Sequence, residues 1–414
     1  MKKFALLLTL LSLTLSVNAQ KQMRIWQGGE STKVDLSDAS VMPYGDGGST
    51  ISIAGTTYEV ADIDSITMIP QVFITFNDAT ASVSDIPASI KDNITVEIDG
   101  AYVTITNTNV SHEVEFVLSG SSSNGSFTYN GIYKATLRLN GLTLLSNRGA
   151  ALDIQCGKRI ALILEEGTTN TLEDYSQGEQ KACLYCRGHM EVEGSGKLYV
   201  AGYASHAIAT KEYLQLKKST GTIGITYATR DAINVNQYFE MRGGWIIITD
   251  DVLGDGLQVD STSTETDEFN GQTFIRGGRL DIHIPGEDCK CLKSAGDITI
   301  SGGSLYLYAN GRGSRGIQTD NNVRIGEADG ATTKIEIEAT GISCGNPDHS
   351  DDPHRCMGMK IDKNLTIDGG NIKVSNTGSK SRGIKVDGTF TFNKGTLNSR
   401  VTTASGTVQY NETR

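Results

Sequence analysis

The sequence predicts an all-β protein: a right-handed parallel β-helix with about 25 residues per coil and a small β appendage at its N-terminus. Two observations carry this prediction. Short runs of alternating apolar residues, typical of strands with one buried face, recur along the chain. Between them a glycine, one spacer and then Leu or Ile repeat at near-constant steps, as in solenoid proteins. The glycines are Gly196, Gly221, Gly244, Gly278, Gly303, Gly370 and Gly395, and residues 333–335 fit the register without one.

Each repeat contains three such runs. Residues 298–300 precede Gly303, residues 305–307 follow it, and a third run opens with a small residue and an aliphatic one, as at Gly316 and Ile317. Glycines permit the tight corners between strands, and stacked coils bury apolar faces that one coil leaves exposed. A leucine-rich repeat needs Leu and Asn at fixed offsets, which are absent here, and a β-propeller needs about 40 residues per blade.

The chain divides into four parts. Residues 1–19 read as a signal peptide, with Lys2 and Lys3 before an apolar core and a small-residue cleavage site at Ala19. A signal peptide implies export, so we expect a secreted, periplasmic or cell-surface location. No later stretch is long and apolar enough to span a membrane. Residues 20–69 form the appendage, with a hairpin at 50–60, or alternatively a module that binds a protein partner. Residues 70–400 form the β-helix, opening with irregular coils that cover its end, and residues 401–414 are a tail.

The net charge of the chain argues against two classes of binding partner. The formal charge of −11 becomes −13 once Lys2 and Lys3 are removed, which argues against nucleic acid and anionic membranes as partners.

Seven cysteines in an exported chain suggest disulfides. Cys344 and Cys356 bound an insertion and are predicted to pair, which would stabilise the fold by about 3 kcal/mol. The pairing of the other five stays open: Cys156, Cys183, Cys186, Cys289 and Cys291.

The third run of each coil presents one outward polar residue, and stacked coils would align these residues about 4.8 Å apart. Amides bond sugar hydroxyls and ammonium groups pair with uronate carboxylates. In several coils the residue just before the small residue that opens this run is also a lysine or an arginine. The predicted polysaccharide-binding residues are Gln258, Lys290, Lys293, Arg315, Gln318, Lys360, Arg382 and Lys385. A solvated sheet face is the alternative interpretation.

Aspartates cluster at the corners of one coil. Calcium takes six to eight oxygen ligands, often carboxylates beside a glycine-rich turn. The predicted calcium ligands are Asp231, Asp250, Asp251, Asp255 and Asp260. Their spacing is not that of an EF-hand, and corner aspartates that cap turns are the alternative.

Three motifs resemble a bacterial family of secreted carbohydrate-binding β-helices. Residues 164–172 (Leu-Glu-Glu-Gly-Thr-Thr-Asn-Thr-Leu) resemble its Glu-Gly-Thr turn around Asn170, and residues 254–257 and 300–305 resemble its glycine corners. The resemblance covers roughly residues 90–397. It implies a fold similar to pectate lyases, calcium in the fold, and binding of cellulose and acidic sugars without catalysis.

These observations predict an exported, non-catalytic protein that binds extended or acidic polysaccharides and holds structural calcium. One alternative is a calcium-dependent, pectate-type lyase, in which calcium neutralises a uronate and Lys290, Lys293 or Arg230 is the base. Another is a surface adhesin or spacer. Hydrolysis by a serine triad has no support, since no G-x-S-x-G motif is present.

Overall fold

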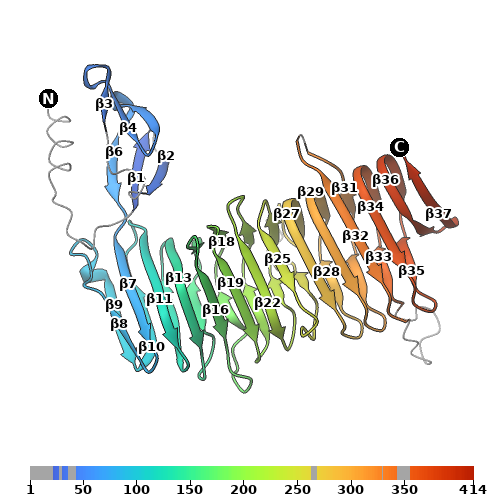
Figure 1. Ribbon diagram of the computed structural model, residues 1–414, viewed down its shortest axis with the longest axis horizontal. Coiled ribbons are helices and arrows are strands. Elements are labelled where there is room, and N and C mark those ends of the chain that lie inside the picture. The colour runs from blue at the N-terminus through green and yellow to red at the C-terminus, as the bar shows by residue number, and fades with distance from the viewer. Residues whose placement is uncertain (1–21, 28–29, 36–42, 263–267, 329, 343–354) are drawn as a thin grey trace.

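The computed structural model describes residues 22–27, 30–35, 43–262, 268–328, 330–342 and 355–414. In this part the chain is all-β, and its helical elements are three short turns, η1 (Asp46–Gly48), η2 (Val60–Asp62) and η3 (Lys91–Asn93). The strands stack along an elongated body with a small module at its N-terminal end (Figure 1). No helix among these residues is long and apolar enough to cross a membrane. The predicted signal peptide and Cys344 lie outside the described residues.

Parallel strands recur in three ladders along the body. The pre-glycine ladder contains β15 (Ile160–Leu164), β18 (Met190–Glu193), β21 (Leu214–Leu216), β24 (Tyr238–Met241) and β31 (Val323–Ile325). The post-glycine ladder contains β16 (Thr169–Glu173), β19 (Lys197–Gly202), β22 (Thr222–Ala228), β25 (Trp245–Ile248) and β32 (Thr333–Ala339). Each strand pairs with the corresponding strand of the next repeat, so the predicted period is confirmed as the period of pairing.

Longer strands contribute to both of these ladders. They are β13 (Ala135–Leu145), β27 (Gln272–Ile284), β29 (Ile298–Ala309), β34 (Leu365–Asn376) and β36 (Phe390–Thr403). The sequence pattern suggested two separate strands here. Instead, Gly278 and Gly303, with φ of 85° and 90°, turn one continuous strand through the corner, and the pairing register shifts between Arg276 and Arg279.

The third-strand ladder follows the small-residue runs. It contains β10 (Ala101–Asn107), β12 (Gly125–Gly131), β14 (Leu152–Cys156), β17 (Ala182–Cys186), β20 (His206–Thr210), β23 (Ile233–Val235), β26 (Leu257–Val259), β28 (Lys290–Ser294), β30 (Arg315–Thr319), β33 (Met357–Ile361) and β35 (Arg382–Val386). The small residue and the aliphatic one after it both enter the core, as Cys291 and Leu292 do.

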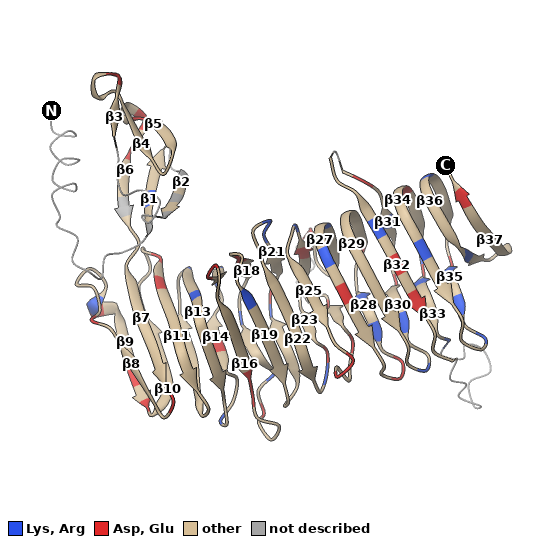
Figure 2. Ribbon diagram, in the orientation of Figure 1, with Lys and Arg blue, Asp and Glu red and all other residues tan. Residues whose placement is uncertain are grey.

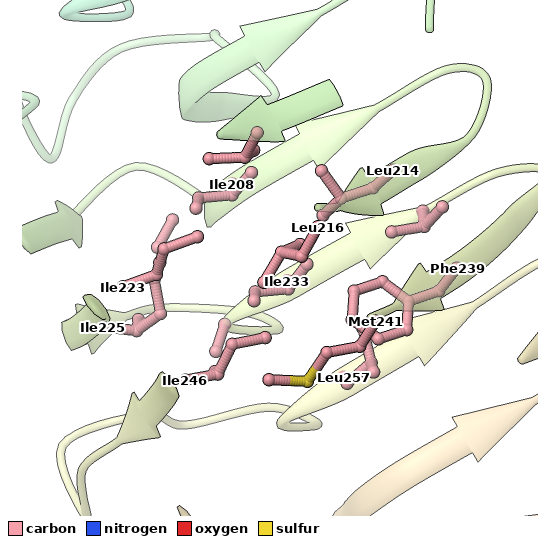
Figure 3. Packing of buried hydrophobic residues seen from close by; sticks show 14 of the residues in the cluster. Ile208, Leu214, Leu216, Ile223, Ile225, Ile233, Phe239, Met241, Ile246 and Leu257 are labelled. Carbon is pink, nitrogen blue, oxygen red and sulfur yellow. The ribbon is translucent and has the colours of Figure 1, made fainter. Parts of the chain in front are cut away.

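Side chains from the three ladders meet in one continuous core. Figure 3 shows Leu216 and Met241 from the pre-glycine ladder, Ile246 from the post-glycine ladder, and Ile233 and Leu257 from the third-strand ladder. All five are at most 1% exposed. Burial of each such side chain contributes about 2 kcal/mol, so the repeated apolar positions supply the main stabilisation of the body.

Asn170, the residue that marks the most distinctive sequence motif, joins three consecutive coils. It is fully buried. Its side-chain oxygen accepts a hydrogen bond of 2.8 Å from the Leu142 amide, and its Nδ2 donates to the Lys197 carbonyl at 3.0 Å. Because buried backbone groups at a corner need partners, the amide side chain supplies both a donor and an acceptor there.

Antiparallel strands occur at both ends of the body. At the N-terminal end β7 (Gln71–Asn77) pairs in parallel with β11 (Val114–Ser122) and antiparallel with β8 (Thr80–Val83), and β9 (Ile94–Asp99) pairs antiparallel with β10. At the other end β37 (Gly406–Thr413) pairs antiparallel with β36. It lies in residues 401–414, which the sequence analysis predicts to be a tail. Such strands cover the edges that a stack of coils would otherwise leave open.

The N-terminal module has its own core. One sheet contains β1 (Gln22–Gln27), β2 (Glu30–Asp35) and β6 (Ser65–Met68), and another contains β3 (Tyr44–Gly45), β4 (Thr50–Ile53) and β5 (Thr56–Glu59). The predicted hairpin is confirmed as β4 and β5. Ala54 and Gly55 form its turn with φ of 49° and 77°, as a two-residue hairpin loop requires. An ion pair between Arg24 and Glu113 joins the module to the body.

Five of the cysteines are buried free thiols: Cys156, Cys183, Cys186, Cys289 and Cys291. Cys183, Cys186 and Cys291 are fully buried in the core, where they act as small apolar residues. The predicted Cys344–Cys356 disulfide stays a prediction, because Cys344 lies outside the described residues.

Candidate functional site

The outward residues of the third-strand ladder stand in register, as the sequence predicts. Gln258 lies opposite Lys293, Lys293 opposite Gln318, then Lys360 and Lys385. Lys290 lies opposite Arg315, and Met357 separates Arg315 from Arg382. All eight predicted binding residues therefore belong to one continuous face, which we call the basic face. Figure 2 shows Lys and Arg positions recurring along this part of the body.

Most lysines of the basic face are paired internally. Lys360 Nζ lies 3.0 Å from Asp362 Oδ1, and Lys385 Nζ lies 3.2 Å from Asp387 Oδ1. Lys293 Nζ lies 3.9 Å from Asp255 and donates to Gln258 at 3.3 Å. Lys290 lies 3.5 Å from Asp288. Sequence reasoning missed these carboxylates, which neutralise much of the positive charge. Asp288, Asp362 and Asp387 each lie two residues from their lysine, a spacing that puts both side chains on one face of a strand.

The two arginines differ from the lysines. Neither Arg315 nor Arg382 has a carboxylate partner among the described residues. Arg315 is only 7% exposed, and its one side-chain hydrogen bond runs from Nη1 to Gln318. Its Nε is buried without an acceptor. A buried guanidinium is costly unless an anion satisfies it, so this side chain is the strongest feature of the face.

Acidic groups replace the cations towards the N-terminal coils. Asp231 Oδ1 accepts from the Asp255 amide at 3.0 Å, and Asp255 Oδ1 accepts from the Lys290 amide at 2.7 Å. His206 Nδ1 lies 3.3 Å from Asp231 Oδ2. Burial raises the pKa of Asp255 to about 6, against the opposing effect of Lys290. Burial, with Arg230, lowers the pKa of His206 to about 4. These groups serve as caps between coils.

The five predicted calcium ligands do not come together. Asp231 and Asp255 each use Oδ1 for the backbone bond above. Both oxygens of Asp260 accept from Gln258, at 2.8 and 2.9 Å. Asp250 lies in the turn after β25, 4.0 Å from His283, and Asp251 is exposed. No three metal-binding side chains converge among the described residues. This donor set fits calcium poorly, and the site stays a prediction.

His206 gives a pH prediction. Its imidazole is neutral in the folded protein, and its unfolded pKa is about 6.5. The stability that this neutral form brings is complete above about pH 6.5 and is lost as the pH falls towards 4. Between pH 7 and pH 5, the free energy of unfolding of the His206→Gln variant should therefore fall by about 2 kcal/mol less than that of the wild type. Urea unfolding at the two pH values measures this difference.

The opposite shift of Asp255 is common to both proteins and cancels in this comparison. Substitution of His283, whose side chain is 42% exposed, is the matched control. Parallel stability curves for His206→Gln and the wild type would show that the histidine is not held neutral.

Sequence reasoning missed a second polar region, on the post-glycine ladder. A groove there is lined by Arg279, His283, Tyr306 and Tyr308 among others. Trp245 lies beside it, with its ring under the Arg279 guanidinium. The sequence contains a signal for this region. In the run after each glycine, the residues between the buried aliphatic ones must face outward. At Gly303 these positions hold Tyr306 and Tyr308.

The described body is all-β, with three parallel ladders and a long polar face. The solved "polysaccharide lyase-like protein from C. thermocellum", a gadolinium derivative, superimposes with a TM-score of 0.51 over 64% of this chain and 99% of its own. Its sequence is 22% identical, so the likeness concerns the fold alone.

The chain belongs to the family of carbohydrate-binding domain-containing proteins, whose model matches residues 99–406. A carbohydrate-binding domain-containing protein of Acetivibrio thermocellus is 24% identical over 156 residues, which cover 34% of this chain and 54% of that protein. The match thus spans about half the length of this relative. The family expected from the Asn170 and glycine-corner motifs is confirmed.

Proposed function

We propose that this protein is an exported, non-catalytic carbohydrate-binding protein whose basic face binds extended acidic polysaccharides. We also infer that its three ladders wind as a right-handed parallel β-helix, which makes the face straight and long. Coils spaced about 4.8 Å apart advance by roughly one sugar ring of an extended chain. A polysaccharide lying along the axis would then meet a new polar residue at each ring.

Arg315 is the observation that carries the proposal. Its guanidinium is buried and lacks a carboxylate, while Gln318 orients it through Nη1. A planar guanidinium donates two parallel hydrogen bonds to a carboxylate, so a uronate would supply the missing partner. Arg382 stands in the same column two strands further on, where it is half-buried.

The lysines of the basic face have a different role in this proposal. A uronate must compete with Asp362 for Lys360 and with Asp387 for Lys385. The ammonium groups therefore stabilise the ligand less than the arginines do. Without Lys2 and Lys3 the formal charge is −13, two units below the −11 of the full chain, and it repels a polyanion at long range. Because salt screens that repulsion over about 10 Å at 0.1 M, moderate salt should help binding.

The absence of catalysis is part of the proposal. A lyase needs a free base beside a bound cation. Lys290 and Lys293 are instead held by Asp288 and Asp255, and the predicted calcium ligands are divided between two ladders. Structural calcium would require Asp231, Asp255 and Asp260 to exchange their present hydrogen bonds for the ion.

One experiment tests the proposal. The pure protein is run in affinity electrophoresis on polygalacturonate, with calcium or with a chelator, while the ultraviolet absorbance of unsaturated uronates is followed. We expect retention in both conditions and a flat absorbance trace. Retention lost with the chelator would establish the calcium site, and a calcium-dependent rise in absorbance would establish the lyase. No retention on polygalacturonate in either condition would contradict the proposal and favour the adhesin or spacer. In that last case, deletion of residues 20–69 would test attachment to the cell surface.

A further inference from the structure

The last strand of the body has an open edge. β37 pairs antiparallel with β36, and no other strand among the described residues pairs with its far side. It lies at the end of the body opposite the N-terminal module (Figure 1). Its sequence, Gly-Thr-Val-Gln-Tyr-Asn-Glu-Thr, contains no proline, lysine or arginine. Proteins commonly place such residues on an edge strand to prevent pairing with another chain, so this edge is left free to pair.

The direction of the backbone groups of β37 follows from its pairing with β36. Gly395 and Arg414 exchange both of their backbone hydrogen bonds, at 3.0 and 2.8 Å. Bonded and non-bonded pairs alternate along an antiparallel ladder, so the even-numbered residues of β37 direct their amides and carbonyls at β36. The odd-numbered residues direct theirs away from the body: Thr407, Gln409, Asn411 and Thr413. Outward backbone groups of this kind are the template onto which another strand adds.

A second copy of β37 fits this edge. In one antiparallel register, centred on Tyr410, all four outward residues of one copy meet the four of the other. Thr407 then lies opposite Thr413, and Gln409 lies opposite Asn411. Both pairs are polar and uncharged. Glu412, the one acidic residue of the strand, lies opposite Val408, so like charges do not face each other across the interface.

The outer face of β37 favours the same register. The Thr407 hydroxyl lies 3.0 Å from that of Thr402, and the Thr413 hydroxyl lies 2.9 Å from that of Thr396. Hydroxyl pairs across neighbouring strands stabilise a sheet. Because the register sets Thr407 opposite Thr413 of the second copy, it joins these two pairs into one row of four hydroxyls.

The inner face of β37 leaves apolar groups open to solvent. Val408 is 55% exposed, although it lies opposite Val401, which is 1% exposed. Tyr410 is half-buried against Phe390, with 5.3 Å between the ring centres. In the centred register the two Tyr410 rings meet and cover this end of the core. Removal of apolar surface from water favours association.

We propose that two copies of this chain join through β37 into a twofold-symmetric dimer, in which the two strands continue one antiparallel sheet. Twofold dimers are the commonest oligomers of soluble proteins. The contact is a single strand and the end of one core, so the interface is small and the dimer has a Kd on the order of 10 µM. This inference does not depend on the ligand of the basic face.

Sedimentation equilibrium tests the dimer. The wild type should have the mass of one chain at about 1 µM and approach that of two chains at about 100 µM. Gln409→Pro removes an outward amide and leaves the bonds to β36 intact, because proline is tolerated on the open side of an edge strand. It should stay a monomer at the higher concentration and unfold in urea like the wild type.

Gln409→Thr is the matched control, since it keeps the amide, and it should dimerise like the wild type. A wild type that stays a monomer at about 100 µM, or a folded Gln409→Pro that dimerises equally well, would overturn the proposal.

Cysteine cross-linking tests the register independently. Directly opposite residues of a non-bonded antiparallel pair have Cα atoms about 4.5 Å apart, which is within the range of a disulfide. Tyr410→Cys should therefore form a covalent dimer on mild oxidation. Two Val408→Cys residues would lie about 13 Å apart and should form none, and the wild type gives the background. Linkage at position 408 alone, or equal linkage at both positions, would contradict the proposed pairing.

Discussion

The Arg315→Gln variant should lose about 10- to 100-fold in affinity for polygalacturonate. Hydrogen bonds to charged groups contribute about 1.5–3 kcal/mol each, and the variant cannot form the bidentate pair with a uronate. Its fold should be as stable as that of the wild type or more stable, because the substitution removes a buried charge without a carboxylate partner. Affinity is measured by electrophoresis on polygalacturonate and stability by urea unfolding.

Arg324→Gln is the matched control for this variant. Arg324 lies on β31 of the pre-glycine ladder, its side chain is 71% exposed, and it pairs with Asp368 at 3.0 Å. The same loss of one positive charge there should leave retention unchanged. Equal retention of Arg315→Gln and the wild type, with both folded, would remove the assignment of Arg315 as the anion-binding residue.

The Gly256→Val variant should be destabilised by about 2 kcal/mol. Gly256 opens a third-strand run, and a side chain there would lie 2.6 Å from both the Cys291 carbonyl oxygen and Ile282 Cγ2. Neither the neighbouring backbone nor the packed Ile282 can withdraw without disturbing the next coil. Urea unfolding measures the loss, and the midpoint should fall without a change in slope.

Gly157→Val is the control, since a side chain at Gly157 would have no atom within 4 Å. It should change the unfolding free energy by less than about 0.5 kcal/mol. A Gly256→Val protein as stable as the wild type would mean that the coils move apart more easily than their close-packed core suggests.

The sequence alone predicts much of the body. The glycine register and the alternating aliphatics determine which residues face the core, and the pairing of Gln258, Lys293, Gln318, Lys360 and Lys385 follows from them. The joining of two runs across Gly303 was not predictable, because a glycine with positive φ suits either a break or a bend within a strand. The irregular pairing of β7, β8 and β9 also breaks the repeat that made the rest predictable.

The candidate site was less predictable, because its chemistry depends on which side chains meet. Asp362 pairs with Lys360, and Asp387 pairs with Lys385. Each aspartate lies two residues after its lysine and neutralises its charge. Asp250 and Asp255 are close in sequence, yet they occupy different ladders, since one follows β25 and the other precedes β26. Aspartates close in sequence reach different faces when they lie between two strands, and this is why the predicted calcium ligands are divided.

The central claim is that Arg315 binds the carboxylate of an acidic polysaccharide. The most direct test compares the affinities of the wild type and Arg315→Gln for hexagalacturonate and for its methyl ester, which has the same sugar rings without the charge. The account predicts a loss of about 10-fold or more on esterification for the wild type, and little further loss in the variant. An equal response of both proteins to esterification would contradict it.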